Sequence, residues 1–158
     1  MGPETYRYHF QHLTGRRQKT FLAIAEELVP PDDTGLSGDD LATAALADWA
    51  IHRLDPSLQK LLMIFLTAWE FLGFLFGGKP FTRLSSEARQ RQMRWFEAAP
   101  IPRLRTGFFG LRAMILMGFY CREDVWPSLG YAGPLLYDRP SPDSEVRALQ
   151  KGKVEAAP

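Results

Sequence analysis

The sequence predicts an all-α protein: a single helical domain of about five helices followed by an extended C-terminal arm. Two observations support this prediction. Apolar residues recur at helical spacing in several segments, and twelve prolines and thirteen glycines separate those segments. The chain has 158 residues, enough for one domain with a sizeable core. We expect an N-terminal arm over residues 1–13, the helical domain over 14–122 and the extended arm over 123–158.

The first two helices are marked by caps and by helical spacing. Thr14 is a suitable N-cap for a helix that ends at Pro30, because proline cannot continue the hydrogen-bond ladder. The pair Ser37 and Asp40 has capping-box spacing and predicts a second helix, which continues to about His52.

The third helix contains the longest apolar run of the chain, residues 61–78, broken only by Thr67 and Glu70. Asp55 and Pro56 have the preferred residue types for its start, and the glycines at its end predict its termination. A run of this length is typical either of a buried core helix or of a membrane element. Because a glutamate near the middle of a bilayer is costly, we expect a core helix rather than a membrane span, and a helix partly covered by a partner is the remaining alternative.

Two further helices follow. Ser85 caps the fourth, and the fifth is the strongly apolar segment 104–120, whose middle contains one charge, Arg112. A buried charge needs a partner, so Glu70 and Arg112 are candidates for a buried ion pair between the third and fifth helices. The alternative is that one of these two charges faces solvent or a partner subunit.

The segment after residue 122 combines aromatic residues, glycines and prolines, and from residue 138 it becomes polar. Such a composition buries too little apolar surface to fold alone, so we expect a segment that is disordered or wraps a partner. The alternative for Trp126 and Tyr131 is that they close one end of the helical core. The candidate partner-interface residues are Trp126, Leu129, Gly130, Tyr131, Gly133, Pro134 and Tyr137.

The sequence contains little that resembles catalytic apparatus. The histidines His9, His12 and His52 do not combine with cysteine at zinc-ligand spacing, and there is no haem-attachment, phosphate-loop or dinucleotide motif. The single cysteine, Cys121, excludes an internal disulfide, and we expect an inert, partly buried thiol because no base is evident near it. We therefore predict no catalytic, cofactor-binding or metal-ligating residue in this chain.

The charges also exclude a function class. The chain has 19 basic and 18 acidic residues, so it has no overall field that would attract nucleic acid. The local group of arginines on and after the fourth helix is interpreted as a solvated face or as the rim of a protein interface. Its members are Arg89, Arg91, Arg94, Arg103 and Arg105.

Several segments resemble a known family. They are RRQKTFLAIAEELVP at residues 16–30, FTRLS at 81–85, the helix around Trp95, and FYCREDVWPSLGYAGP at 119–134. They are similar to gluconate 2-dehydrogenase subunit 3-type proteins, the small helical subunits that accompany flavin-dependent dehydrogenases of the glucose-methanol-choline (GMC) superfamily. They also resemble the N-terminal helical region of long-chain alcohol oxidases. The resemblance covers about residues 16–135, and its most specific part runs from Trp126 to Pro134.

The resemblance implies a non-catalytic small subunit that binds and stabilises a GMC-type flavoprotein. FAD would be bound by the larger chain, and electrons would pass on to a cytochrome c or a quinone. No residue matches a flavin or haem ligand, so no cofactor is expected in this chain. Arg16 and Arg17 resemble a twin-arginine signal, but Glu26 and Glu27 interrupt the segment behind them. We therefore expect no export signal, and a location either in the periplasm, by export together with the partner, or in the cytoplasm.

Two alternatives from other classes remain open. The first is a membrane-associated anchor subunit that uses the apolar helices 61–78 and 104–120. The second is a free-standing enzyme with Glu70 and Arg112 around a small pocket.

Overall fold

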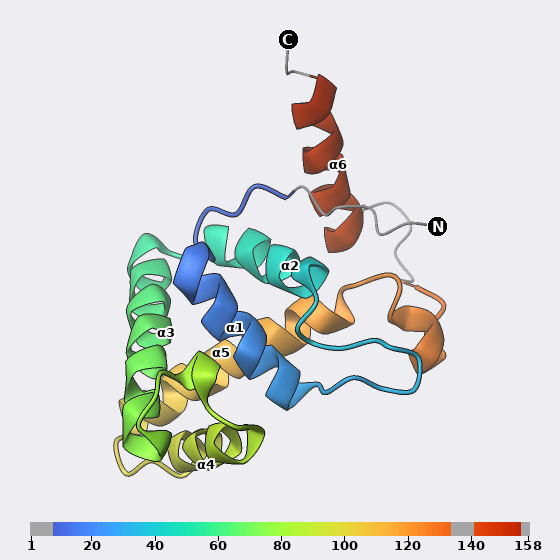
Figure 1. Ribbon diagram of the computed structural model, residues 1–158. Helices are drawn as coiled ribbons and strands as arrows, with labels where there is room; N and C mark the ends of the chain where they lie inside the picture. The colour runs from blue at the N-terminus through green and yellow to red at the C-terminus, as the bar shows by residue number, and fades with distance from the viewer. Residues whose placement is uncertain (1–7, 134–140, 156–158) are drawn as a thin grey trace.

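The described part of the chain, residues 8–133 and 141–155 of a computed structural model, consists of helices and the loops between them (Figure 1). These residues contain no strand, so the prediction of an all-α domain is confirmed. The α-helices are α1 (Gly15–Leu28), α2 (Leu41–His52), α3 (Pro56–Gly77), α4 (Ser86–Glu97), α5 (Pro102–Tyr120) and α6 (Pro142–Glu155). Two short 3-10 helices are η1 (Phe81–Arg83) and η2 (Trp126–Leu129).

Three of the first five helices, α1, α3 and α4, begin at the predicted N-cap residues Thr14, Asp55 and Ser85. The carboxylate of Asp55 accepts a hydrogen bond from the backbone N–H of Ser57 at 2.8 Å, and the hydroxyl of Ser85 accepts one from Ala88. At α2 the N-cap is Asp40, which accepts a hydrogen bond from Ala42, so the expected capping box led by Ser37 is not formed. Thr14 stands at the N-cap of α1 without a side-chain capping bond.

The core of the domain is centred on Trp69 of α3, which is completely buried. Its ring stacks on Phe96 of α4 at 4.2 Å between centroids and on Phe108 of α5 at 5.6 Å. Phe81 of η1 meets the same ring edge to face at 5.8 Å. Because aromatic pairs in these geometries stabilise beyond their buried area, this cluster joins α3, η1, α4 and α5.

The expectation that α3 is buried on all sides is wrong. Only 28% of its most apolar 18-residue window is buried. Trp69 and Glu70 face the domain, whereas Leu61, Ile64 and Leu75 are 61%, 56% and 78% exposed. Figure 1 shows α3 at the outer edge of the bundle, with no other helix on its outer side. A continuous apolar run does not distinguish a helix buried all round from one with an uncovered apolar face.

The described end of the N-terminal arm lies across its own domain. The carboxylate of Asp48 on α2 accepts hydrogen bonds from the backbone N–H groups of Gln11 at 2.9 Å, His12 at 2.8 Å and Leu13 at 2.7 Å. Asp48 and Leu13 are both completely buried. One carboxylate with three donors therefore fixes this segment on α2.

The prediction of an extended arm over residues 123–158 is wrong for residues 142–155, which form α6. The helix starts in a favourable context: the Ser141 hydroxyl accepts a hydrogen bond from the Ser144 N–H, and Pro142 occupies the first turn. Val146 is completely buried against Ala45 and Leu46 of α2. One well-placed valine and a cap thus support a helix that composition alone does not predict.

Candidate functional site

Five of the seven predicted interface residues lie in the described part of the chain, between Trp126 and Gly133, and Pro134 and Tyr137 lie outside it. We refer to residues 126–133 as the aromatic turn. Leu129 is 54% exposed and Tyr131 is 47% exposed, whereas Trp126 is half-buried. Tyr131 is therefore not a core residue, which argues against the alternative that both aromatic residues close the core.

The aromatic turn has a defined conformation. The Trp126 indole N–H donates to the backbone carbonyl of Tyr120 at 2.9 Å, and the rings of Trp126 and Tyr131 meet edge to face at 5.4 Å between centroids. Gly130 and Gly133 have φ angles of 65° and 110°, a region that residues with a Cβ rarely adopt. These contacts present Leu129 and Tyr131 to solvent on a folded turn.

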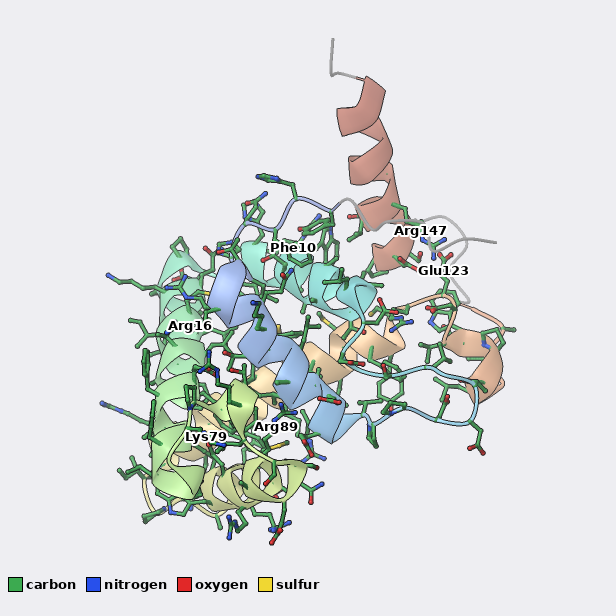
Figure 2. The ribbon with its side chains drawn as sticks, in the orientation of Figure 1. Phe10, Arg16, Lys79, Arg89, Glu123 and Arg147 are labelled. Carbon is green, nitrogen blue, oxygen red and sulfur yellow. The ribbon has the colours of Figure 1, made fainter. Side chains whose placement is uncertain are left out.

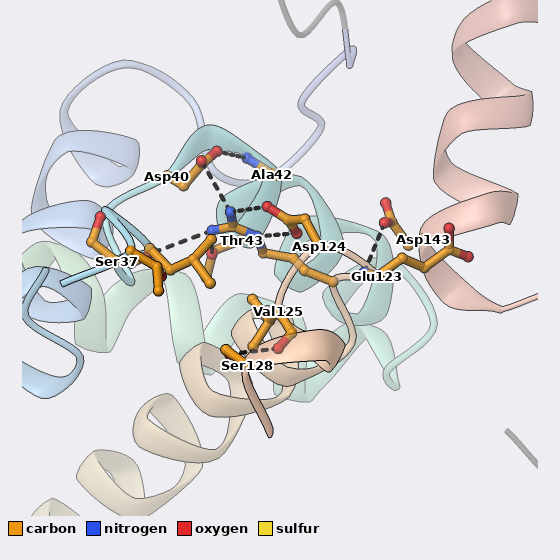
Figure 3. Close-up of polar contacts among 12 residues, drawn as sticks. Ser37, Asp40, Ala42, Thr43, Glu123, Asp124, Val125, Ser128 and Asp143 are labelled. Carbon is orange, nitrogen blue, oxygen red and sulfur yellow. Dashed lines mark hydrogen bonds and ion pairs between the residues drawn. The ribbon is translucent and has the colours of Figure 1, made fainter. Parts of the chain in front are cut away.

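A buried arginine cluster holds the chain at the entry to this turn (Figure 3). Arg122 is 2% exposed, and its Nε and Nη2 donate to the two carboxylate oxygens of Asp124 at 3.0 and 2.6 Å. Its Nη2 also lies 3.2 Å from the carboxylate of Asp40, the N-cap of α2. Its Nη1 donates to the Ser37 carbonyl and the Thr43 hydroxyl, both at 3.2 Å. Arg122 therefore joins the end of α5 to the start of α2.

The electrostatics of this cluster favour the charged forms. Burial alone would lower the pKa of Arg122, but the hydrogen bond to Asp124 and the charges of Asp40 and Asp124 outweigh burial and raise it. The hydrogen bond from Arg122 lowers the pKa of Asp124, against a smaller opposing effect of burial. Both groups are thus ionised across the neutral range.

This shift predicts how stability depends on pH. Since the folded-state pKa of Asp124 is below its unfolded value, its stabilising contribution is complete above the unfolded pKa and is lost as the pH falls through the folded pKa. We expect Asp124→Asn to destabilise the protein at pH 7, and the difference from the parent to shrink below about pH 3.9, the usual value for aspartate. Urea unfolding of both proteins across this range measures the effect, and a constant difference would contradict it.

A second surface is larger and apolar. We refer to it as the α3–α5 face. Between the two helices runs a groove of about 520 Å³, lined by apolar residues such as Leu62, Phe65 and Met114 and by the polar residues Arg103 and Thr106. The face contains the exposed residues Leu58, Leu61, Ile64, Phe71, Phe74 and Leu75 of α3, with Phe109 of α5 and Ile101 just before it. Phe71 lies at the edge toward α1, where the guanidinium of Arg16 is 5.9 Å from its ring centroid. Exposed apolar residues that adjoin in this way mark an interaction site.

The expected ion pair between Glu70 and Arg112 is not present. Glu70 is 3% exposed and accepts hydrogen bonds from the Thr20 hydroxyl and from the Thr82 N–H, both at 3.1 Å, and from the Thr82 hydroxyl at 2.6 Å. Arg112 instead lies 3.5 Å from the exposed carboxylate of Glu97. Neutral donors satisfy the buried carboxylate, a solution that helix spacing alone does not indicate.

Two histidines that are distant in the sequence lie close together. His12 Nε2 and His52 Nδ1 lie 3.4 Å apart on the surface. Within the described residues no three His, Cys, Asp or Glu side chains form a metal-binding group. Burial raises the pKa of the Cys121 thiol, with a smaller effect from the charge of Asp143. This environment disfavours the reactive thiolate.

The arginines of α4 and α5 have mixed roles. Arg89 forms ion pairs with Glu26 at 3.0 Å and with Glu27 at 3.6 Å, and so joins α4 to α1. Arg91 donates to the Phe76 carbonyl and Arg105 to the Ala99 carbonyl, each at 3.3 Å. Figure 2 shows Arg89 in the region between α1 and α4.

No protein-family model, curated protein or solved structure matches this chain.

Proposed function

We propose that this protein is a non-catalytic small subunit that binds and stabilises a larger FAD-dependent dehydrogenase of the GMC type, and that the aromatic turn is a principal contact with that partner. The observation that carries the proposal is the exposed, pre-organised turn at residues 126–133. It coincides with the most specific part of the resemblance to gluconate 2-dehydrogenase subunit 3-type proteins.

The physical character of the turn supports a docking role. Exposed aromatic and leucine side chains on a rigid backbone lose little conformational freedom on binding, so more of the contact energy appears as affinity. Arg122 and the Trp126–Tyr120 hydrogen bond supply this rigidity. Tryptophan and tyrosine are also the residue types that dominate binding energy at protein interfaces.

In this proposal the chemistry belongs to the partner. FAD would be held by the larger chain, electrons would leave the complex through a cytochrome c or a quinone, and the small subunit would be located wherever its partner is. The small subunit would cover apolar surface of the folded flavoprotein. Because it binds the folded and not the unfolded flavoprotein, it would raise the free energy of unfolding of that partner.

Co-purification of aromatic-turn variants tests the proposal. We expect the tagged full-length chain to retain a flavoprotein-sized partner from its native host, and Tyr131→Ala combined with Leu129→Ala to reduce the recovered partner by at least about tenfold, the effect of losing one interface hot spot. Both side chains are about half exposed, so the helical content should not change.

Trp95→Ala is the matched control, because Trp95 is an aromatic residue of similar exposure, 43%, on a different element, α4. Equal loss of the partner in the control and in the turn variant would contradict a role for the turn. Full retention of the partner by the turn variant would do the same.

A further inference from the structure

We propose that the α3–α5 face binds the surface of an anionic lipid bilayer, with α3 lying in the plane of the interface and not spanning it. The inference uses residues outside the aromatic turn and does not depend on the identity of the protein partner.

The first line of evidence is the outer stripe of α3. Leu61, Ile64, Ala68, Phe71 and Leu75 follow one another at intervals of three or four residues, and the four large side chains among them are each at least 51% exposed. Between Lys60 and Lys79 the only charged residue is Glu70, which is buried on the opposite side. From Leu61 to Leu75, about 21 Å at about 1.5 Å per residue, the stripe therefore carries no charged residue of its own, and Arg16 of α1 lies over its Phe71 ring at 5.9 Å.

The second line of evidence is the distribution of charge. Residues 56–120 contain nine Lys and Arg against three Asp and Glu, whereas the rest of the chain contains ten against fifteen. Lys60 and Lys79 are exposed at the two ends of the α3 stripe, and Arg103 lines the groove beside it. Figure 2 shows Lys79 near the C-terminal end of α3. Within this range Arg89 pairs with Glu26 and Glu27 of α1, and Arg112 pairs with Glu97. Lys60, Lys79 and Arg103 are therefore the cations at this face that a negatively charged surface would attract, and long cationic side chains at an apolar rim can reach lipid headgroups.

The packing of α3 determines how it meets the bilayer. It is the one helix in the described residues that is long and apolar enough to cross a membrane. Its inner side, however, holds Trp69 in the core and Glu70 in hydrogen bonds to Thr20 and Thr82. A spanning orientation would place these contacts in hydrocarbon, whereas an interfacial orientation leaves them intact. An amphipathic helix with an apolar face and cationic flanks is typical of interfacial binding.

The same argument limits the role of α5. Phe108, Leu111, Ile115 and Phe119 are buried in the domain, so this helix supplies only the rim of the face. Membrane attachment through two independent hydrophobic helices is therefore not part of the proposal.

Vesicle flotation of the full-length chain tests the inference. We expect binding to vesicles of phosphatidylcholine with about 30% phosphatidylglycerol, weaker binding to pure phosphatidylcholine, and a further decrease when salt screens the charges. Leu75→Asp should lower the partition coefficient by at least about tenfold, because it places a charge at the most exposed residue of the apolar stripe. Leu41→Asp, at a 42%-exposed leucine of α2, is the matched control and should bind like the parent.

A second variant, Lys60→Glu with Lys79→Glu, should remove the preference for anionic vesicles. All substituted positions are exposed, so far-ultraviolet circular dichroism should be unchanged. Absence of binding to anionic vesicles, or equal binding by the parent and Leu75→Asp, would overturn the inference. So would a protein partner, or a second copy of this chain, that is lost specifically in Leu75→Asp, because the face would then be a protein interface.

Discussion

Replacing Arg122 with alanine is expected to lower the free energy of unfolding by about 3 to 5 kcal/mol, the range for breaking a buried charged network. Arg122 is 2% exposed and bonds to two carboxylates, a backbone carbonyl and a hydroxyl. The variant leaves the Ser37 carbonyl and the Thr43 hydroxyl without this donor. Asp40 and Asp124 are about half exposed and can be hydrated, so the lower end of the range is expected.

Chemical denaturation of Arg122→Ala and of a surface control measures this effect. Arg112→Ala is the control. The side chains of Arg112 and Glu97 are 43% and 51% exposed, so their ion pair should contribute less than about 1 kcal/mol. Arg122→Lys keeps the charge but not the planar two-point contact with Asp124, and should lie between the two. Similar losses for Arg122→Ala and Arg112→Ala would show that the cluster does not organise the junction of α2 and α5.

Asp48→Ala should have the second largest effect, a loss of about 2 to 4 kcal/mol, because it leaves three backbone N–H groups without their acceptor. These donors belong to Gln11, His12 and Leu13, and Leu13 is completely buried. We expect the segment before α1 to open, so amide hydrogen exchange at Leu13 should accelerate more than exchange in α3 and α5.

Asp48→Asn keeps one acceptor oxygen and should lose about half as much stability. Asp55→Ala removes an exposed N-cap and should cost about 1 kcal/mol. If Asp48→Ala is no more destabilising than Asp55→Ala, the carboxylate is not the anchor that holds the N-terminal segment on α2.

Much of the fold could be predicted because its signals are local. Asp55, Pro56 and Ser85 mark helix starts in the sequence, and the structure places caps at these positions. The prediction was wrong where the deciding interaction is tertiary or is a single residue. One buried valine, Val146, stabilises α6, and the outer side of α3 is exposed because no helix of the described residues covers it, which hydropathy does not reveal.

The candidate site divides in the same way. The aromatic turn was predicted as a segment, because tryptophan, tyrosine and glycine residues lie close together in the sequence. The residues that fix it were not predicted, because Arg122 meets Ser37 and Thr43 across 85 and 79 positions of the chain. Glu70 was assigned the wrong partner, because its donors, Thr20 and Thr82, are 50 and 12 positions away and carry no charge.

The most direct test of the central claim is an absorption spectrum of the complex that the tagged full-length chain retains from its native host. The proposed role as a small subunit predicts a co-purifying larger chain with flavin bands at about 370 and 450 nm, the colour of the bound cofactor. Haem bands in the same spectrum would identify a cytochrome as the electron acceptor. A colourless protein without a partner would contradict the proposal.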